Sequence, residues 1–91
     1  MKETMDRVYS FIDASRDETL EFWEEIVRME SGSREPEKVR LLGERLKLEF
    51  EKVGFECELV EVGVNAPTLV GVLGKDRPAK PVVFSGHMDT V

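Results

Sequence analysis

Hydrophobic residues in the first third of the chain recur at steps of three and four positions, which is the period of an amphipathic α-helix. One such stripe covers 5–12, and a second covers 20–27. Between them, Ser15 precedes Glu18 by three positions, the spacing of a capping box at the start of a helix. The serines and glycine at 31–33 favour a loop. The pattern therefore predicts two helices, of which the second opens at the capping box and ends at 31–33.

The strongest amphipathic stripe runs through 39–53, where large apolar residues are separated by charged ones at helical spacing. Pro36 suits the first turn of a helix, because its missing N–H is not needed there. Gly54 suits the left-handed position just past a helix end, and Phe55 can then pack back on Phe50. We therefore predict a third helix that starts near Pro36 and closes with a Schellman-type ending.

After Gly54 the hydrophobic period changes to two, the period of a β-strand. Apolar residues and glutamates alternate at 55–62, which predicts a strand that has one exposed face or lies at a sheet edge. A second strand is predicted at 68–73, where Gly71 marks a bulge or a close approach. The run PVVF at 81–84 is wholly apolar and predicts a short central strand, buried on both faces. The pattern indicates an α/β fold of three helices followed by three strands of rising burial.

The composition, 41% apolar and 35% charged, is that of an ordinary globular protein. With 13 basic and 19 acidic residues the net charge is -6, which argues against nonspecific binding to nucleic acid or to an acidic membrane surface. The sequence contains neither an apolar run of membrane-spanning length nor the basic flank and apolar run of a signal peptide. Cys57 is the only cysteine, so no internal disulfide can form. These features favour a cytoplasmic protein.

A chain of 91 residues forms at most one small domain with a thin core. The most apolar strand, 81–84, is followed by only seven residues and by no helix that could cover it. A central strand without its covering layer exposes apolar surface. We therefore expect 1–91 to be an incomplete segment of a larger domain.

The candidate metal-binding and catalytic residues, His87 and Asp89, lie just after this strand. His87 is the only histidine, and ligand sites in open α/β sheets lie at the carboxyl ends of strands. Asp89 lies two positions further on, so in extended chain its side chain emerges on the same side as that of His87. A neutral imidazole is a common metal ligand, and a carboxylate beside it fixes the tautomer. The plain alternative is a surface histidine that takes part only in hydrogen bonds.

The run PVVFSGHMDTV at 81–91 closely resembles the first signature of a family of zinc-dependent amidohydrolases and exopeptidases. That family includes acetylornithine deacetylase, succinyl-diaminopimelate desuccinylase, aminoacylase, glutamate carboxypeptidase and dipeptidases. The segment 22–33 resembles the helix ending that precedes the family's third helix. The segment 39–58 resembles the passage that follows in the family, a helix, then glycine and phenylalanine, then a strand. Glu30 departs from the family pattern, in which many members have proline at this point. The resemblance spans nearly the whole chain in the family's order.

The resemblance implies the N-terminal part of a three-layer αβα catalytic domain, with a smaller domain inserted downstream. It implies that His87 binds one of two zinc ions, for which cobalt can substitute, and that Asp89 is the supporting catalytic carboxylate. The implied reaction is hydrolysis of an amide bond in an N-acyl amino acid or a short peptide by metal-activated water. We expect the parent enzyme to be homo-oligomeric and, from the composition and N-terminus of the chain, cytoplasmic.

The same resemblance implies that the other metal ligands and the general base lie beyond Val91. A catalytic zinc site needs about three protein ligands, whereas this chain offers His87 with Asp89 beside it. We therefore expect the isolated chain neither to retain the metal pair nor to hydrolyse a substrate. Two alternatives stay open. One is a truncated, inactive chain that folds by self-association; the other is a small acidic interaction module unrelated to any enzyme.

Other conspicuous residues have simpler interpretations. Phe22 and Trp23 are expected to pack in the core or against another subunit. Cys57, on a half-buried strand, is expected to be an inert small hydrophobe. Glu24 and Glu25 resemble a catalytic glutamate pair in letters only, because they lie inside an early surface helix.

Overall fold

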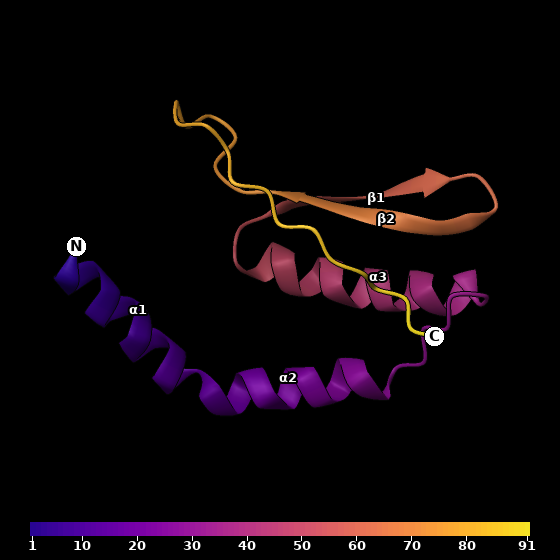
Figure 1. The fold of residues 1–91 in the computed structure, drawn as a ribbon, viewed down its shortest axis with the longest axis horizontal. Coiled ribbons are helices and arrows are strands. Elements are labelled where there is room, and N and C mark those ends of the chain that lie inside the picture. Colours follow the sequence, from indigo (N-terminus) through magenta and orange to yellow (C-terminus); the bar gives the residue numbers. More distant parts are fainter.

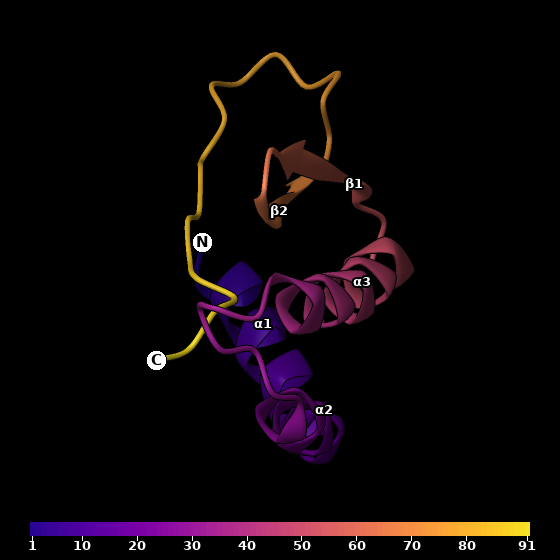
Figure 2. The same cartoon turned by 90° about the vertical axis from the view of Figure 1, so that its right-hand side faces the viewer.

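A computed structural model describes all 91 residues and contains three helices and one β-hairpin. Helix α3 forms a middle layer between the hairpin and α2. Helix α1 precedes α2 in the chain and projects away from the other elements (Figures 1 and 2). The three helices and the first two strands confirm the small mixed α/β pattern. The elements are α1 (Lys2–Ala14), α2 (Arg16–Arg28), α3 (Pro36–Lys52), β1 (Glu56–Val62) and β2 (Asn65–Val72).

The end of α3 follows the predicted Schellman geometry. Gly54 takes a φ of 98°, in the left-handed region, and its N–H donates to the carbonyl of Glu51. The N–H of Phe55 donates to the carbonyl of Phe50 over 3.1 Å. The Phe50 and Phe55 rings then meet edge to face, with centroids 5.0 Å apart. This ending turns the chain back so that β1 runs along α3, and it confirms the prediction.

The predicted capping box between α1 and α2 is wrong. The hydroxyl of Ser15 donates backward to the carbonyl of Phe11 over 2.8 Å and makes no capping bond to the start of α2. Ser15 is the single residue between the two helices, and its N–H also donates to Phe11. The N–H and hydroxyl of Ser15 therefore donate to carbonyls at the end of α1. The capping-box prediction had instead paired the hydroxyl with an N–H group at the start of α2. Helix α2 also ends earlier than predicted, at Arg28.

Strands β1 and β2 pair antiparallel across a tight turn. Cys57 and Leu59 are half-buried, whereas Glu56 and Glu58 are exposed, as the alternation predicted. Gly71 pairs with Cys57, and a β-carbon at position 71 would come within 3.3 Å of the Cys57 sulfur. Gly71 is therefore a close-approach point, while the irregularity in the ladder falls between Val60 and Val62.

The core is thin and centres on one turn of α3. Val39 is 4% exposed and Leu42 6% exposed, and Gly43 is buried beside them. A β-carbon on Gly43 would lie 3.1 Å from Leu59 of β1 and 3.5 Å from Met88. The absence of a side chain at Gly43 thus lets the hairpin and the C-terminal segment approach α3 at the same point.

The third predicted strand, 81–84, is absent, and the predicted rise in burial is wrong. Val82, Val83 and Phe84 are 79%, 81% and 93% exposed, and their segment is extended but unpaired. A strand needs a partner for its backbone N–H and C=O groups, and this segment passes to one side of the hairpin without pairing with either strand (Figure 2). Local apolarity predicts a preference for burial, but it cannot supply the neighbouring strand.

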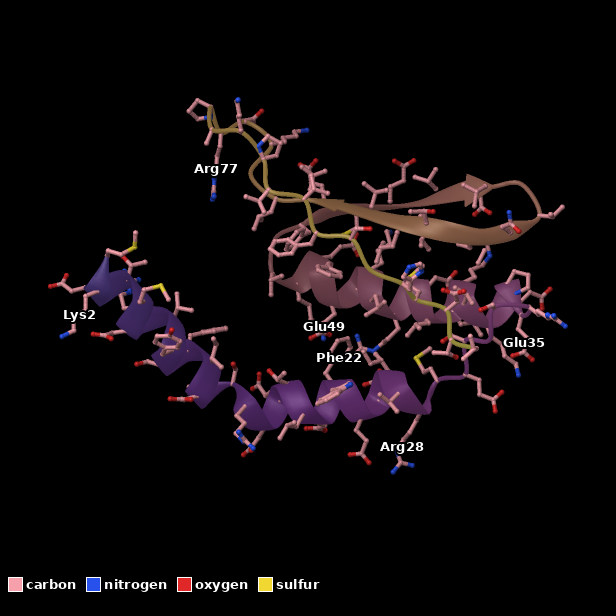
Figure 3. All side chains as sticks on the ribbon, viewed as in Figure 1. Lys2, Phe22, Arg28, Glu35, Glu49 and Arg77 are labelled. Atoms are coloured by element: carbon pink, nitrogen blue, oxygen red, sulfur yellow. The ribbon has the colours of Figure 1, made fainter.

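Arg45 joins α2 to α3. Its guanidinium lies 4.7 Å from the centroid of the Phe22 ring and pairs with Glu25 of α2 and with Glu49 of α3. Phe22 faces α3 in Figure 3, whereas Arg28 points away from it. Ile26 of α2 is also half-buried, but neither α1 nor α2 contains a buried residue, and most of their apolar stripes are exposed. No helix combines the length and apolarity needed to cross a membrane.

We predict that Leu42→Ala will destabilise the fold by about 2–5 kcal/mol, because it opens a cavity in a core that has few other buried side chains. The matched control is Leu41→Ala on the same helix, since Leu41 is 57% exposed and should change stability by less than about 0.5 kcal/mol. Urea denaturation followed by circular dichroism measures both. Equal losses for the two variants would contradict the proposed core.

Candidate metal-ligand site

The C-terminal segment docks on the loop between α2 and α3. The N–H of Thr90 donates to the carbonyl of Ser31 over 2.8 Å, and the N–H of Ser33 donates to the carbonyl of Thr90 over 2.8 Å. These bonds form a short parallel bridge between Gly32 and Thr90. In Figure 1 the end of the chain lies beside this loop. The bridge brings the predicted site residues next to a segment more than 50 positions earlier in the sequence.

Met88 fixes the same segment to the core. It is the only residue between 81 and 91 that is not exposed, and it lies against Gly43 of α3. Because successive side chains of extended chain point to opposite sides, burial of Met88 turns His87 and Asp89 away from the core. The order His87, Met88, Asp89, with one apolar residue between two polar ones, therefore directs the His87 and Asp89 side chains away from the core.

The two predicted site residues lie together, and a third side chain joins them. The Nδ1 atom of His87 lies 3.6 Å from Oδ1 of Asp89, slightly beyond hydrogen-bond distance. The hydroxyl of Ser33 donates to Oδ2 of Asp89 over 2.8 Å. The His87 side chain is 92% exposed and that of Asp89 is 41% exposed. Asp89 is thus held from one side by Ser33 and faces the imidazole on the other, and the imidazole is open to solvent.

The hydrogen bond from Ser33 lowers the pKa of the Asp89 carboxyl, while partial desolvation opposes that shift and the nearby His87 adds to it. Asp89 is therefore ionised at neutral pH. An ionised carboxylate beside Nδ1 favours a proton on that nitrogen, which leaves Nε2 with its lone pair free.

The order of contacts excludes a serine-nucleophile arrangement. A hydrolytic triad needs the histidine between the serine and the carboxylate, so that the imidazole can take the hydroxyl proton. Here the carboxylate of Asp89 stands between Ser33 and His87, and the Ser33 hydroxyl donates to the carboxylate. Ser33 therefore donates to Asp89, and no imidazole is placed to take its proton.

The donor set fits part of a metal site. An imidazole with an ionised carboxylate at its other nitrogen suits Zn²⁺ or Co²⁺. No group of three or more histidine, cysteine, aspartate or glutamate side chains in the structure could enclose an ion. The structure thus brings together one imidazole and one carboxylate, fewer than the three protein ligands of a catalytic zinc site.

A groove of about 990 Å³ opens beside the site. His87, Ser33 and Asp89 lie among its polar lining, while Phe50 and Phe84 contribute to its apolar lining. An imidazole that borders a groove of mixed polar and apolar lining has room for an organic ligand next to it.

The contacts of the other conspicuous residues indicate no catalytic role. Glu24 pairs with Arg28 over 2.7 Å on the exposed side of α2, and Glu25 pairs with Arg45, so the two carboxylates have separate partners. Burial raises the pKa of the Cys57 thiol, which disfavours the reactive thiolate. Trp23 is 60% exposed, so its expected place in the core is wrong, and packing against another subunit stays a prediction.

Comparison with known proteins gives no match: no family model, no curated protein and no solved structure matches this chain. The interpretation of the site therefore rests on its residues and geometry. Sequence reasoning missed Ser33 as a site residue. Its signal was the loop SGS at 31–33, but a serine in such a loop has no sequence feature that connects it to a carboxylate 56 positions later.

We predict that Ser33→Ala will raise the pKa of the Asp89 carboxyl, because it removes the hydrogen bond that favours the ionised form. The pKa of Asp89 in the folded chain lies below its unfolded value of about 3.9. Its contribution to stability is thus complete above the unfolded pKa and is lost as the pH falls through the folded pKa. NMR titration of the Asp89 carboxyl carbon measures the change. Ser85→Ala is the matched control, and an unchanged Asp89 pKa in Ser33→Ala would contradict the hydrogen bond.

Proposed function

We propose that this chain supplies one metal ligand, His87, and its supporting carboxylate, Asp89, to a dinuclear metal-dependent amidohydrolase. The observation that carries the proposal is the placement of Asp89, which is held by Ser33 on one side and faces Nδ1 of His87 on the other. A histidine whose second nitrogen meets a carboxylate is the usual arrangement for zinc ligation. The signature-like sequence at 85–91 is the reason for choosing this reaction class.

The residues of this chain have two roles in the proposed enzyme. His87 offers Nε2 to a metal ion from an exposed position, and Asp89 fixes the tautomer that makes this nitrogen available. When bound, a pair of zinc or cobalt ions polarises the amide carbonyl and supplies hydroxide from water at neutral pH. A complete centre needs further ligands, which these 91 residues do not place near His87.

The proposed substrates are N-acyl amino acids or short peptides, bound in the parent enzyme. The groove beside His87, lined by Phe50 and Phe84 among others, supports a ligand with an apolar portion. We also propose a three-layer αβα parent domain in a cytoplasmic homo-oligomer, of which 1–91 is the N-terminal segment. The lone Cys57, with its raised thiol pKa, is compatible with a reducing compartment.

We predict that the isolated chain will bind one Zn²⁺ or Co²⁺ ion weakly, at His87, because a single imidazole with one carboxylate cannot enclose an ion. His87 is the only histidine, so its ring signals in NMR spectra report binding directly. Co²⁺ should broaden these signals first, and His87→Asn should abolish the effect. Asp89→Asn should weaken it, because the amide no longer favours the proton on Nδ1.

The matched control for Asp89→Asn is Asp76→Asn, which changes the same charge in the loop after β2. Failure of Co²⁺ to perturb the His87 ring would overturn the ligand assignment. Tight binding of two ions by the isolated chain would contradict the view that the site is incomplete.

As a second candidate function, we propose that this chain assembles with copies of itself, and the observation that favours it is its exposed area. The accessible surface is 8132 Å², against about 5,400 Å² for a compact monomer of this mass. The radius of gyration is 15.5 Å, against about 12 Å for a compact chain of this length. The excess area is larger than the roughly 800 Å² that each partner buries in a standard interface.

The uncovered apolar stripes of α1 and α2 are the surfaces proposed for this contact. Ile12 and Trp23 are 54% and 60% exposed, and neither helix contains a buried residue. An exposed apolar stripe on an amphipathic helix is stabilised by packing against a second apolar surface.

We predict that the chain self-associates and that Ile12→Glu or Trp23→Glu shifts it towards monomer, because each variant places a charge in the apolar contact. Light scattering over a dilution series measures the effect. Val64→Glu is the matched control, since Val64 is 93% exposed at the hairpin turn, away from α1 and α2. A monomer at every concentration would exclude this candidate.

The coding sequence beyond the Val91 codon separates the two candidates. An open frame that adds further carboxylate and histidine ligands would support the amidohydrolase. A natural stop codon at that point would leave self-association as the candidate for the chain itself.

A further inference from the structure

We propose that Ser33 is the positioning residue of this site, and that its hydroxyl keeps Asp89 directed at Nδ1 of His87 so that Nε2 remains the coordinating nitrogen. The proposal rests on the proposed metal-ligand role of His87 and extends it to a residue from another part of the chain. The Ser33 hydroxyl makes hydrogen bonds to Asp89 and to the Thr90 carbonyl, and none to the imidazole. Its effect passes through the carboxylate of Asp89.

The position of Ser33 is fixed by the backbone, independently of its side chain. Its N–H donates to the carbonyl of Thr90, the residue next to Asp89, over 2.8 Å. The neighbouring bond from the N–H of Thr90 to Ser31 completes the bridge, and Ser31 is only 3% exposed. The hydroxyl therefore starts from a defined place beside Asp89, which is the condition for a short and directional hydrogen bond.

The hydroxyl of Ser33 has two acceptors within reach but only one proton to donate. Oδ2 of Asp89 lies at 2.8 Å and the carbonyl of Thr90 at 3.1 Å. The ionised carboxylate is the stronger acceptor, and the Thr90 carbonyl already accepts the N–H of Ser33. The hydroxyl thus donates mainly to Asp89.

Asp89 has no other side-chain donor within hydrogen-bond distance, since the His87 contact is 3.6 Å. Its side chain is 41% exposed, so without Ser33 it is free to rotate into water. A freely rotating carboxylate spends less time beside Nδ1, and the two neutral tautomers of His87 then approach their populations in an isolated imidazole. Partners of this kind change metal affinity by about 10- to 100-fold when removed.

The test compares Ser33→Ala with Ser33→Thr, which keeps the hydroxyl. It also includes Ser85→Ala, because Ser85 lies in the segment that carries His87 and makes no side-chain hydrogen bond. The first readout uses the metal-free chain well above the ordinary imidazole pKa of about 6.5, where ring ¹⁵N shifts report which nitrogen of His87 carries the proton. The second readout is the affinity for Co²⁺ from broadening of the His87 signals.

The proposal expects Ser33→Ala to shift the protons of His87 from Nδ1 towards Nε2 and to weaken Co²⁺ binding by about tenfold, the lower end of the range for such partners. Ser33→Thr should restore both values, and Ser85→Ala should match the wild type. If Ser33→Ala loses the docked segment, Ser33→Cys keeps the volume with a much weaker donor and should show the same two effects. Wild-type tautomer populations in Ser33→Ala and in Ser33→Cys would overturn the proposal.

The two readouts distinguish the positioning role from the metal-ligand role. A tautomer shift in Ser33→Ala together with no Co²⁺ binding by the wild type would sustain the positioning role and refute the metal-ligand role. Co²⁺ binding at His87 with no dependence on Ser33 would sustain the metal-ligand role and refute the positioning role.

Discussion

One turn of α3 is the contact on which the other elements depend. Leu42 is among the few buried side chains, and Gly43 leaves room above it for Leu59 of the hairpin and for Met88 of the C-terminal segment. Burial of apolar surface is the main favourable contribution to folding, and in this chain much of it is concentrated at this turn. The hairpin, the terminal segment and α3 are thus joined at one place, while α1 and most of α2 contribute little to the core.

The candidate site is a consequence of this contact. Met88 holds the extended segment against α3, and the bridge between Ser31, Ser33 and Thr90 sets its register. Register matters here because a shift of one residue would bury His87 or Asp89 and expose Met88. With the observed register, Asp89 lies between Ser33 and an open imidazole, the arrangement that supports the proposed metal-ligand role. Core packing and site geometry therefore depend on the same few residues.

The exposed apolar surface and the small number of possible ligands beside His87 can be interpreted together. Apolar residues at 82–84 and along α1 and α2 are exposed, and no group of three or more histidine, cysteine, aspartate or glutamate side chains that could hold a metal ion is present. Additional protein packed on these surfaces would bury the apolar residues and could supply further metal ligands. Under the amidohydrolase proposal the remainder of a catalytic domain does both, and under the self-association proposal other copies of the chain cover the apolar faces.

The sequence by itself determined the elements whose signals are local. Helical spacing predicted α3, Gly54 and Phe55 predicted its ending, and alternation predicted β1, because each of these depends on residues within one or two turns. It also identified His87 and Asp89 as neighbours. Only the tertiary structure decided that 81–84 stays unpaired and that Ser33 reaches Asp89. Strand pairing and a contact across 56 positions depend on which distant segments meet, and that is determined by packing against the whole fold, not by local spacing.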